Sequence, residues 1–335
     1  MSGIGVAGNL ILDRYMEIEA YPERASLTTI HSVTPSPGGL AYNCAVDLAR
    51  LDPSLPISVV GLVGDDSDGD AIVSHFHPYP SIDTSRIRRV GQTSFSDVME
   101  DAQTRERTFF QFRGANALLD EEDINFASAD IDLLHVGYIL LLDRLDAPDP
   151  EFGTRMARLL AQTQSRGIKT SVDVVSEVSD RFRSIVPAAL RYCDYCIVNE
   201  VEASRTTGIE ISHQGTVDVE ALRRAAQAIV EMGVSTWAVI HWAGGAAGLT
   251  PDGEWVVRPS IRLAPNEIVT STGAGDAFAS GVLYGAWKEL SLAESIELGS
   301  AAAAGSLHHG NSTDGVGPWR EMLQAYADAE YEDLS

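Results

Sequence analysis

The hydrophobic residues of this chain gather in short runs that are separated by longer amphipathic segments. Runs rich in Val and Ile predict strands, at residues 4–8, 57–62, 131–136, 169–174, 195–198 and 236–240. Segments of helical period lie between them, at 41–51, 69–76, 153–166, 201–207, 219–232, 275–287 and 292–307. Apolar strands that alternate with helices are typical of parallel β-α units. The pattern therefore predicts an α/β fold built on a doubly wound, mostly parallel sheet.

Two stretches depart from this rhythm, at about residues 14–37 and about 88–114. Both contain alternating polar and apolar positions, as in 93–99 (TSFSDVM) and 107–112 (RTFFQF). This period of two predicts antiparallel strands, and we expect the two stretches to form one small sheet together. The chain has no internal repeat and no obvious linker. We therefore expect a single domain over residues 1–335, with the small sheet as an appendage.

The charge of the chain narrows the classes of partner. Acidic residues number 48 and basic residues 24, so the formal net charge is −24. A nucleic-acid binder or a protein of anionic membrane surfaces needs a basic face, so neither class is favoured. Three cysteines are too few for a disulfide framework. Because there is also no secretory signal and no apolar run of membrane-spanning length, we expect a cytoplasmic protein.

Two phosphate-binding patterns can be judged directly. Of the 24 basic residues only Lys169 and Lys288 are lysine, and neither follows a glycine, which excludes a Walker P-loop. Residues 3–8 match G-x-G-x-x-G, the spacing of a dinucleotide-binding turn. That turn must follow a strand, whereas residues 3–8 themselves form the first predicted strand. We therefore interpret these glycines as part of the strand.

The most specific chemical signal lies in residues 271–281, which read STGAGDAFASG. Gly273, Ala274 and Gly275 let the backbone turn tightly, so that successive N–H groups point toward one place. The predicted helix that follows brings its positive end to the same place, and the segment predicts an anion hole. Asp276 in the first turn can be a helix-capping carboxylate. It can also accept a proton from a hydroxyl that attacks a phosphate.

These motifs together resemble the ribokinase-like (PfkB) carbohydrate kinases over nearly the whole chain. The resemblance rests on residues 272–276 (TGAGD), 38–51 (GGLAYNCAVDLARL), 61–66 (GLVGDD) and 199–202 (NEVE). It implies a ribokinase-like fold whose small sheet is a lid over the sugar and can join two subunits as a homodimer. It also implies transfer of the γ-phosphoryl group of ATP to a hydroxyl of a small carbohydrate.

The resemblance also assigns roles to individual residues. Asp276 matches the catalytic base, and the backbone of Gly273, Ala274 and Gly275 matches the hole for the transferring phosphoryl group. Glu202 matches the glutamate that helps to hold Mg²⁺. The positions assigned to binding the acceptor are Asp13, Gly39, Asn43 and Arg107, and those assigned to ATP are Asn199, Thr272, Gly244 and Asn311. For Arg107 two interpretations stay open, a contact to an anionic group of the acceptor and an exposed lid arginine.

The chain departs from the family pattern at two places. Thr270 stands where the family often has an aspartate that helps to bind a monovalent cation, so the resemblance gives no support for activation by potassium. Residues 241–245 (HWAGG) replace the usual Thr or Lys, apolar, Gly turn on the nucleotide side. Two alternatives to a sugar kinase remain, namely a nucleoside kinase of the same family and a non-catalytic binding protein derived from a kinase.

Overall fold

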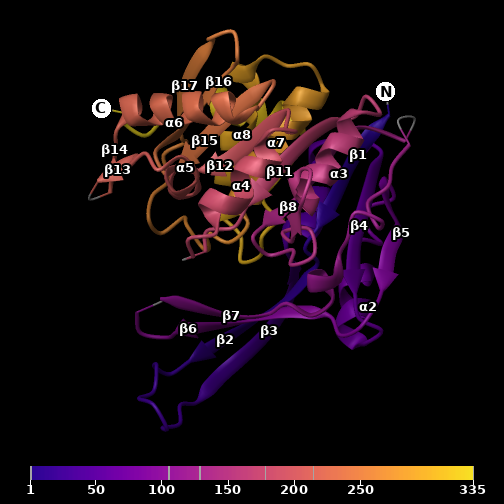
Figure 1. Ribbon diagram of the computed structural model, residues 1–335. Coiled ribbons are helices and arrows are strands. Elements are labelled where there is room, and N and C mark those ends of the chain that lie inside the picture. The colour runs from indigo at the N-terminus through magenta and orange to yellow at the C-terminus, as the bar shows by residue number, and fades with distance from the viewer. Residues whose placement is uncertain (1, 105, 128–129, 178, 214, 335) are drawn as a thin grey trace.

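The computed structural model describes residues 2–104, 106–127, 130–177, 179–213 and 215–334. These residues contain a nine-stranded sheet in the order β17-β16-β15-β12-β11-β8-β1-β4-β5 (Figure 1). The strands from β15 to β5 run parallel, and β16 and β17 continue the sheet in antiparallel pairs. The strands are β1 Gly3–Gly8, β4 Ile57–Val63, β5 Ile82–Arg89, β8 Ile131–Ile139, β11 Lys169–Val174, β12 Tyr195–Asn199, β15 Trp237–Trp242, β16 Gly245–Leu249 and β17 Trp255–Pro259.

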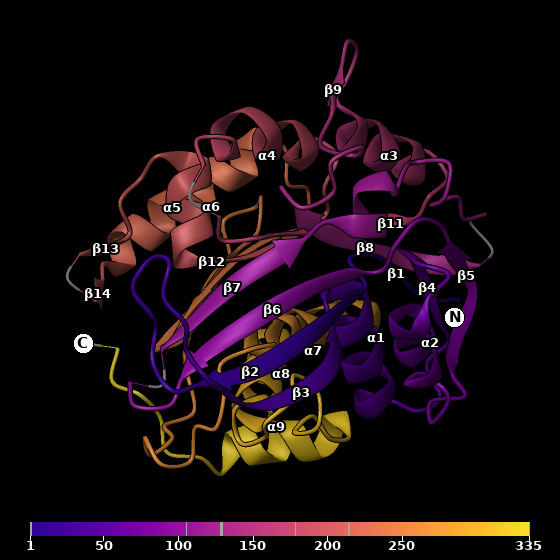
Figure 2. The same cartoon turned by 90° about the horizontal axis from the view of Figure 1, so that it is seen from below.

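Helices cover both faces of this sheet (Figure 2). One face carries α1 Leu40–Leu51, α2 Ser67–Ser74, α7 Ala274–Trp287, α8 Leu292–Leu307 and α9 Trp319–Ala327. The other carries α3 Arg155–Gln164, α4 Phe182–Leu190, α5 Glu200–Thr207 and α6 Val219–Met232. Successive strand residues point to opposite faces, so Val59 belongs to the first hydrophobic core and Val60 to the second. The predicted doubly wound, mostly parallel fold is confirmed.

The six strands predicted from apolar runs are present, and three further strands extend the sheet. β5 carries charged residues at the edge of the sheet, and β16 consists of glycine, alanine and one leucine. Neither has the Val- and Ile-rich run that indicates a buried strand. Residues 3–8 form the buried strand β1, as expected from their context.

A second sheet projects from the body and is the lowest part of Figure 1. Its strands are β3 Ile30–Gly38, β2 Ile11–Ile18, β6 Ser94–Asp101 and β7 Arg107–Phe112, in that order. The outer pairs are antiparallel, whereas β2 and β6 run parallel. The segment that connects β2 to β6 contains β3, α1, β4, α2 and β5. Residues 88 and 89, inside the predicted stretch, end β5 of the main sheet. Arg105, also inside it, lies outside the described residues.

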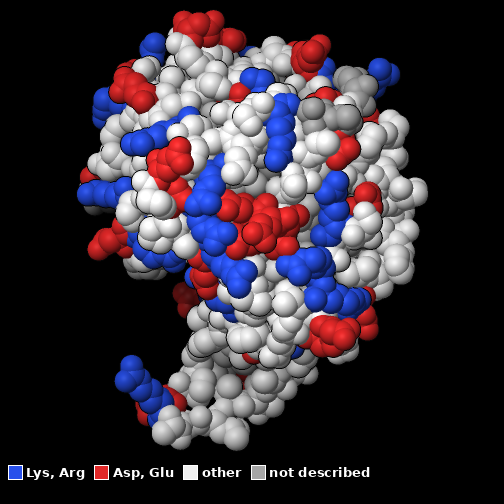
Figure 3. Space-filling model, turned by 45° about the vertical axis from the view of Figure 1, so that its right-hand side comes forward, with Lys and Arg blue, Asp and Glu red and all other residues white. Residues whose placement is uncertain are grey.

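Many arginines of the described surface are paired with carboxylates. On the face shown in Figure 3, acidic and basic side chains lie next to one another. Arg155, for example, lies 2.5 Å from Asp120 and 3.5 Å from Glu121, and Arg158 lies 3.1 Å from Glu121. Among the described residues, no helix is both long and apolar enough to cross a membrane.

Candidate active site

The backbone turn that opens α7 is constrained on one side by packing. Gly273 precedes the helix with φ = 85°, a conformation that favours glycine, and a Cβ there would lie 2.3 Å from Cβ of Ser312. Helix geometry leaves the first N–H groups of α7, at Gly275 and Asp276, without an acceptor inside the helix. These groups and the positive end of α7 therefore form a place suited to an anion.

Asp276 lies in the first turn of α7, and its carboxylate is held by two side chains from other elements. Asn43 of α1 donates from Nδ2 to Oδ2 at 2.7 Å. The Tyr138 hydroxyl lies 2.8 Å from Oδ1 and 2.7 Å from Oδ2. Burial raises the pKa of Asp276, whereas the hydrogen bonds from Asn43 and Tyr138 lower it by stabilising the anion. The result is a desolvated carboxylate of fixed orientation, which is what a general base requires.

Two residues that the sequence did not indicate complete this network. Tyr138 follows the end of the apolar part of β8, and its backbone N–H donates to Oδ1 of Asn9 at 2.7 Å. The Ser312 hydroxyl donates to Oδ1 of Asn43 at 2.7 Å, which turns the Asn43 amide so that its NH₂ group faces Asp276. Their contacts span at least 129 positions in sequence, so no local pattern marks them.

The small sheet brings a second carboxylate close to Asp276. Asp13 lies on β2, and burial raises its pKa to about 6, with a hydrogen bond from Ser96 opposing this effect and the charge of Asp276 adding to it. Gly38 and Gly39 pass directly beside it. A Cβ on Gly38 would lie 2.4 Å from Oδ2 of Asp13, and Gly39 has φ = 85°. The predicted acceptor residues Asp13, Gly39 and Asn43 are therefore brought together next to Asp276.

Glu202 lies at the start of α5, at the carboxyl ends of the parallel strands. Its Oε2 accepts from the Asn199 backbone N–H at 3.0 Å, and the Asn199 side chain in turn caps the helix. Its Oε1 accepts from the Ser176 hydroxyl at 2.7 Å. Burial raises the pKa of Glu202 to about 7 despite these donors.

A further buried carboxylate, Asp173, ends β11 near Glu202 and Asp276. Burial and these two neighbouring charges raise the pKa of Asp173 well above its ordinary value. No set of three or more potential ligands surrounds one point in the described chain, so the protein alone does not form a metal cage there. Mg²⁺ in phosphoryl-transfer sites needs only one or two carboxylates, with phosphates and water as its other ligands. Asp173 and Glu202 fit such a site. Asp173 was not predicted from the sequence.

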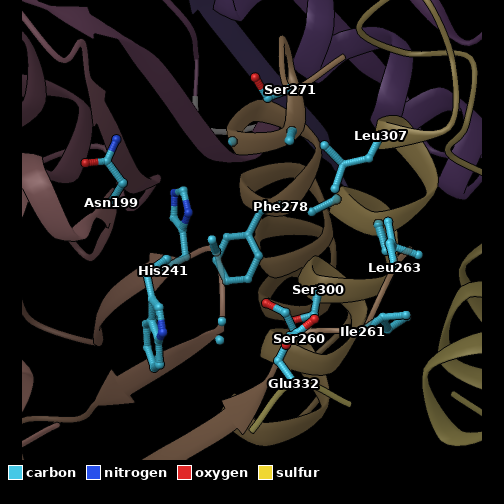
Figure 4. A pocket seen from close by; sticks show the side chains of 18 of the residues that line it. Asn199, His241, Ser260, Ile261, Leu263, Ser271, Phe278, Ser300, Leu307 and Glu332 are labelled. Carbon is cyan, nitrogen blue, oxygen red and sulfur yellow. The ribbon is translucent and has the colours of Figure 1, made fainter. Parts of the chain in front are cut away.

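A cavity of about 600 Å³ lies beside the opening of α7. Asn199 and His241 line it from the sheet side, and Ser271, Phe278 and Leu307 line it from the opposite side (Figure 4). Its lining also includes Gly244, Ala274 and Gly275. The volume and the largely apolar wall suit a nucleotide whose phosphates reach the α7 amides.

Two residues assigned to ATP lie elsewhere. The hydroxyl of Thr272 lies 3.4 Å from Nη1 of Arg107 and so faces the small sheet. Asn311 lines a second cavity, of about 740 Å³, between the small sheet and the body. Arg107 itself is bound to Glu100 and to Thr270, at 2.6 Å in both cases. The structure thus places Thr272, Asn311 and Arg107 beside the small sheet rather than beside the 600 Å³ cavity.

The chain is similar to several known proteins in sequence and in fold. The chain is 27% identical over 274 residues to the 5-dehydro-2-deoxygluconokinase of Clostridium beijerinckii, which covers 80% of this chain and 77% of the relative. It is 24% identical over 331 residues to the ATP-dependent ribose-1-phosphate kinase of Halopiger xanaduensis, covering 97% and 98%. The ribokinase of Arabidopsis thaliana, solved with ribose and ATP, has the same fold, with a TM-score of 0.80, 19% identity and coverage of 97% and 99%.

The family model for pfkB carbohydrate kinases matches residues 6–317, a span that includes the Gly38–Gly39 turn, Glu202 and the α7 opening with Asp276. The chain therefore belongs to the pfkB family of carbohydrate kinases and is a phosphotransferase with an alcohol group as acceptor.

Proposed function

We propose that this protein transfers the γ-phosphoryl group of ATP to a hydroxyl of a small carbohydrate. The observation that carries the proposal is the setting of Asp276. Its carboxylate is buried, oriented by Asn43 and Tyr138, and close to Asp13. The same turn of α7 borders the cavity of nucleotide size. A base for the acceptor and a hole for the phosphoryl group thus adjoin each other.

In the proposed reaction, Asp13, Asn43 and the backbone at Gly39 hold the hydroxyls of the acceptor. The reacting hydroxyl oxygen attacks the γ-phosphorus, the bond from that phosphorus to the bridging oxygen of ADP breaks, and the proton passes to Asp276. The amides from Gly273 to Gly275 stabilise the charge on the phosphoryl oxygens. Tyr138 keeps the accepting carboxylate in place throughout.

The nucleotide would lie in the 600 Å³ cavity, where Asn199 and Gly244 belong to the lining. Thr272 and Asn311 stay as proposed ATP residues, from the family resemblance alone. Mg²⁺ would be held by Glu202 together with Asp173 and would neutralise phosphate charge.

We also propose that the small sheet forms a homodimer contact. Phe109, Phe110 and Val33 of this sheet are each more than half exposed. Exposed apolar side chains on a projecting element are typical of a protein interface. The cytoplasmic location expected above stays a proposal as well, and the three cysteines are buried and unpaired in the described structure.

The proposal predicts that Asp276→Asn loses turnover while ATP still binds. The amide cannot accept the proton, so we expect kcat to fall by about 10²–10⁴-fold. ATP affinity, measured by calorimetric titration, should change little because the amides of α7 stay in place. A variant with near-normal kcat would contradict Asp276 as the base.

The acceptor class is tested by ADP release over a panel of free sugars, sugar phosphates and nucleosides. We expect turnover with a free sugar. Activity confined to nucleosides would establish the nucleoside kinase alternative instead. ATP binding without ADP release for any acceptor would establish a non-catalytic binding protein.

A further inference from the structure

Arg107 connects the small sheet to the loop that leads into the anion hole. It begins β7 and lies opposite Glu100 on β6, where its Nε donates to Oε2 of Glu100 at 2.6 Å. Its Nη1 donates to Oγ1 of Thr270 at 2.6 Å and to Oγ1 of Thr272 at 3.4 Å. The two ends of this contact lie 163 and 165 positions apart in sequence.

The loop contacted by Arg107 depends on the Thr270 hydroxyl for its own shape. Oγ1 of Thr270 also accepts from the Thr272 backbone N–H at 3.2 Å, and the Thr270 side chain is buried. Tyr15, on β2 of the small sheet, hydrogen bonds the side chain of Thr272. The Arg107 guanidinium lies over the Tyr15 ring, 5.7 Å from its centroid. Two strands of the small sheet thus hold the same three-residue loop.

Gly273 follows this loop and opens the turn before α7, so the position of the loop affects the shape of that turn. The close packing of Gly273 against Ser312 leaves little freedom on one side of the turn. On the other side the turn is held by Thr272, and so by the small sheet. Tyr15 is two residues from Asp13 on the same strand and points to the same face. The strand that would touch the acceptor therefore also holds the loop that would receive the phosphoryl group.

We propose that Arg107 is a positioning residue that holds the loop 270–272 against the small sheet, so that the anion hole has its working geometry only when this sheet lies over the acceptor. The proposal deepens, and rests on, the function proposed above. Nε and Nη1 of Arg107 are already bound within the protein. In this role the charge of Arg107 acts through Thr270 and Thr272 and does not contact substrate. A contact from Arg107 to an anionic group of the acceptor is the alternative that the kinetic test below distinguishes from this role.

The kinetic test compares Arg107→Met, Thr270→Val and the double variant, with Arg14→Met as control. Arg14 is also an arginine of the small sheet, but its side chain pairs with Asp68 at 2.6 Å and not with the loop 270–272. We expect each single variant to lower kcat by about 10-fold or more, with KM for the acceptor changed by less than about threefold, because the loop acts on the transferring group. The loss in the double variant should be smaller than the product of the two single losses, since both single variants remove the contact between Arg107 and Thr270.

Two kinetic outcomes would overturn the proposal. If Arg107→Met raises the KM of an anionic acceptor while Thr270→Val has normal kinetics, then Arg107 binds the acceptor directly. If the losses in the two single variants multiply in the double variant, the residues act separately. Normal kinetics in Arg14→Met is expected, and a loss of kcat there equal to that of Arg107→Met would show that any lid arginine has this effect.

Hydrogen–deuterium exchange gives a readout that does not depend on activity. Arg107→Met should raise exchange both in peptides covering β6 and β7 and in those covering residues 268–276, while the rest of the main sheet stays unchanged. Exchange unchanged in residues 268–276 would overturn the positioning role. If the wild-type protein phosphorylates no acceptor, the proposed function fails, but this measurement still decides whether Arg107 holds the loop.

Discussion

Replacing Tyr138 with phenylalanine tests whether Asp276, the proposed catalytic base, depends on its hydrogen bonds. The Tyr138 hydroxyl lies within 2.8 Å of both oxygens of Asp276, and it stabilises the charged form of that group. Without this donor, burial acts with less opposition, and the pKa of Asp276 rises further above its ordinary value. The ring of the variant keeps the volume, so packing around Asp276 should be retained.

The size of the effect follows from the strength of one hydrogen bond to a charge. Such a bond contributes about 1.5–3 kcal/mol, and a tenfold change in an ionisation equilibrium corresponds to about 1.4 kcal/mol. Tyr138→Phe should therefore move the acidic limb of the kcat/KM profile to higher pH by roughly one to two pH units. Above that limb the carboxylate is ionised in both proteins, so the difference in rate that remains there measures the orienting role of Tyr138.

The assay is ADP release between about pH 4.5 and 9, with acceptor far below KM so that the free enzyme is reported. Tyr284→Phe is the matched control. Tyr284 lies on α7, the helix that carries Asp276, and its hydroxyl donates to a different carboxylate, Asp52, at 2.9 Å. The acidic limb of Tyr284→Phe should coincide with that of the wild type. An unmoved limb in Tyr138→Phe, whatever the rate on the plateau above it, would refute the effect of Tyr138 on the pKa of Asp276.

Two further predictions concern stability. Asp47 on α1 is fully buried, neither carboxylate oxygen has a partner in the described structure, and burial raises its pKa well above the usual value. The folded state thus keeps a proton that the unfolded state loses above about pH 4. The free energy of unfolding therefore falls as pH rises toward the folded pKa, by at most about 1.4 kcal/mol per pH unit. Asp47→Asn should remove this slope from urea unfolding measured at pH 4 to 8, and an identical slope in both proteins would contradict the prediction. Gly273→Ala should lower the free energy of unfolding by about 1–3 kcal/mol and abolish turnover, because alanine is strained at φ = 85° and its Cβ would meet Ser312. Gly275→Ala, whose Cβ would have its nearest neighbour at 3.8 Å, should unfold no more easily than the wild type.

Local patterns predicted the elements that are repetitive and strongly apolar. Strand β1 and helix α7 follow from runs whose period matches one secondary structure. Strand β16 has no such run, and helix α4 contains Pro187, so neither stands out in sequence. These elements exist because neighbouring strands and helices supply the packing that their own residues do not demand.

The candidate site divides in the same way. Asp276 and the glycines before it were found because a tight turn, a helix start and a carboxylate follow one another in the chain. Tyr138 and Asp173 were missed because nothing in their own strands sets them apart, and their partners come from other segments of the chain. An acidic residue at the carboxyl end of a predicted parallel strand is the one available signal for Asp173, since ligands of such sheets bind at that edge.

The sequence by itself determined the class of fold and the position of the proposed anion hole, and it excluded a Walker P-loop. Backbone conformation and helix polarity, on which the last two depend, are properties of adjacent residues. Tertiary structure alone decided which side chains orient Asp276 and where Arg107 points. Those contacts join residues more than 130 positions apart, and their energies depend on burial and distance, which only the folded chain creates.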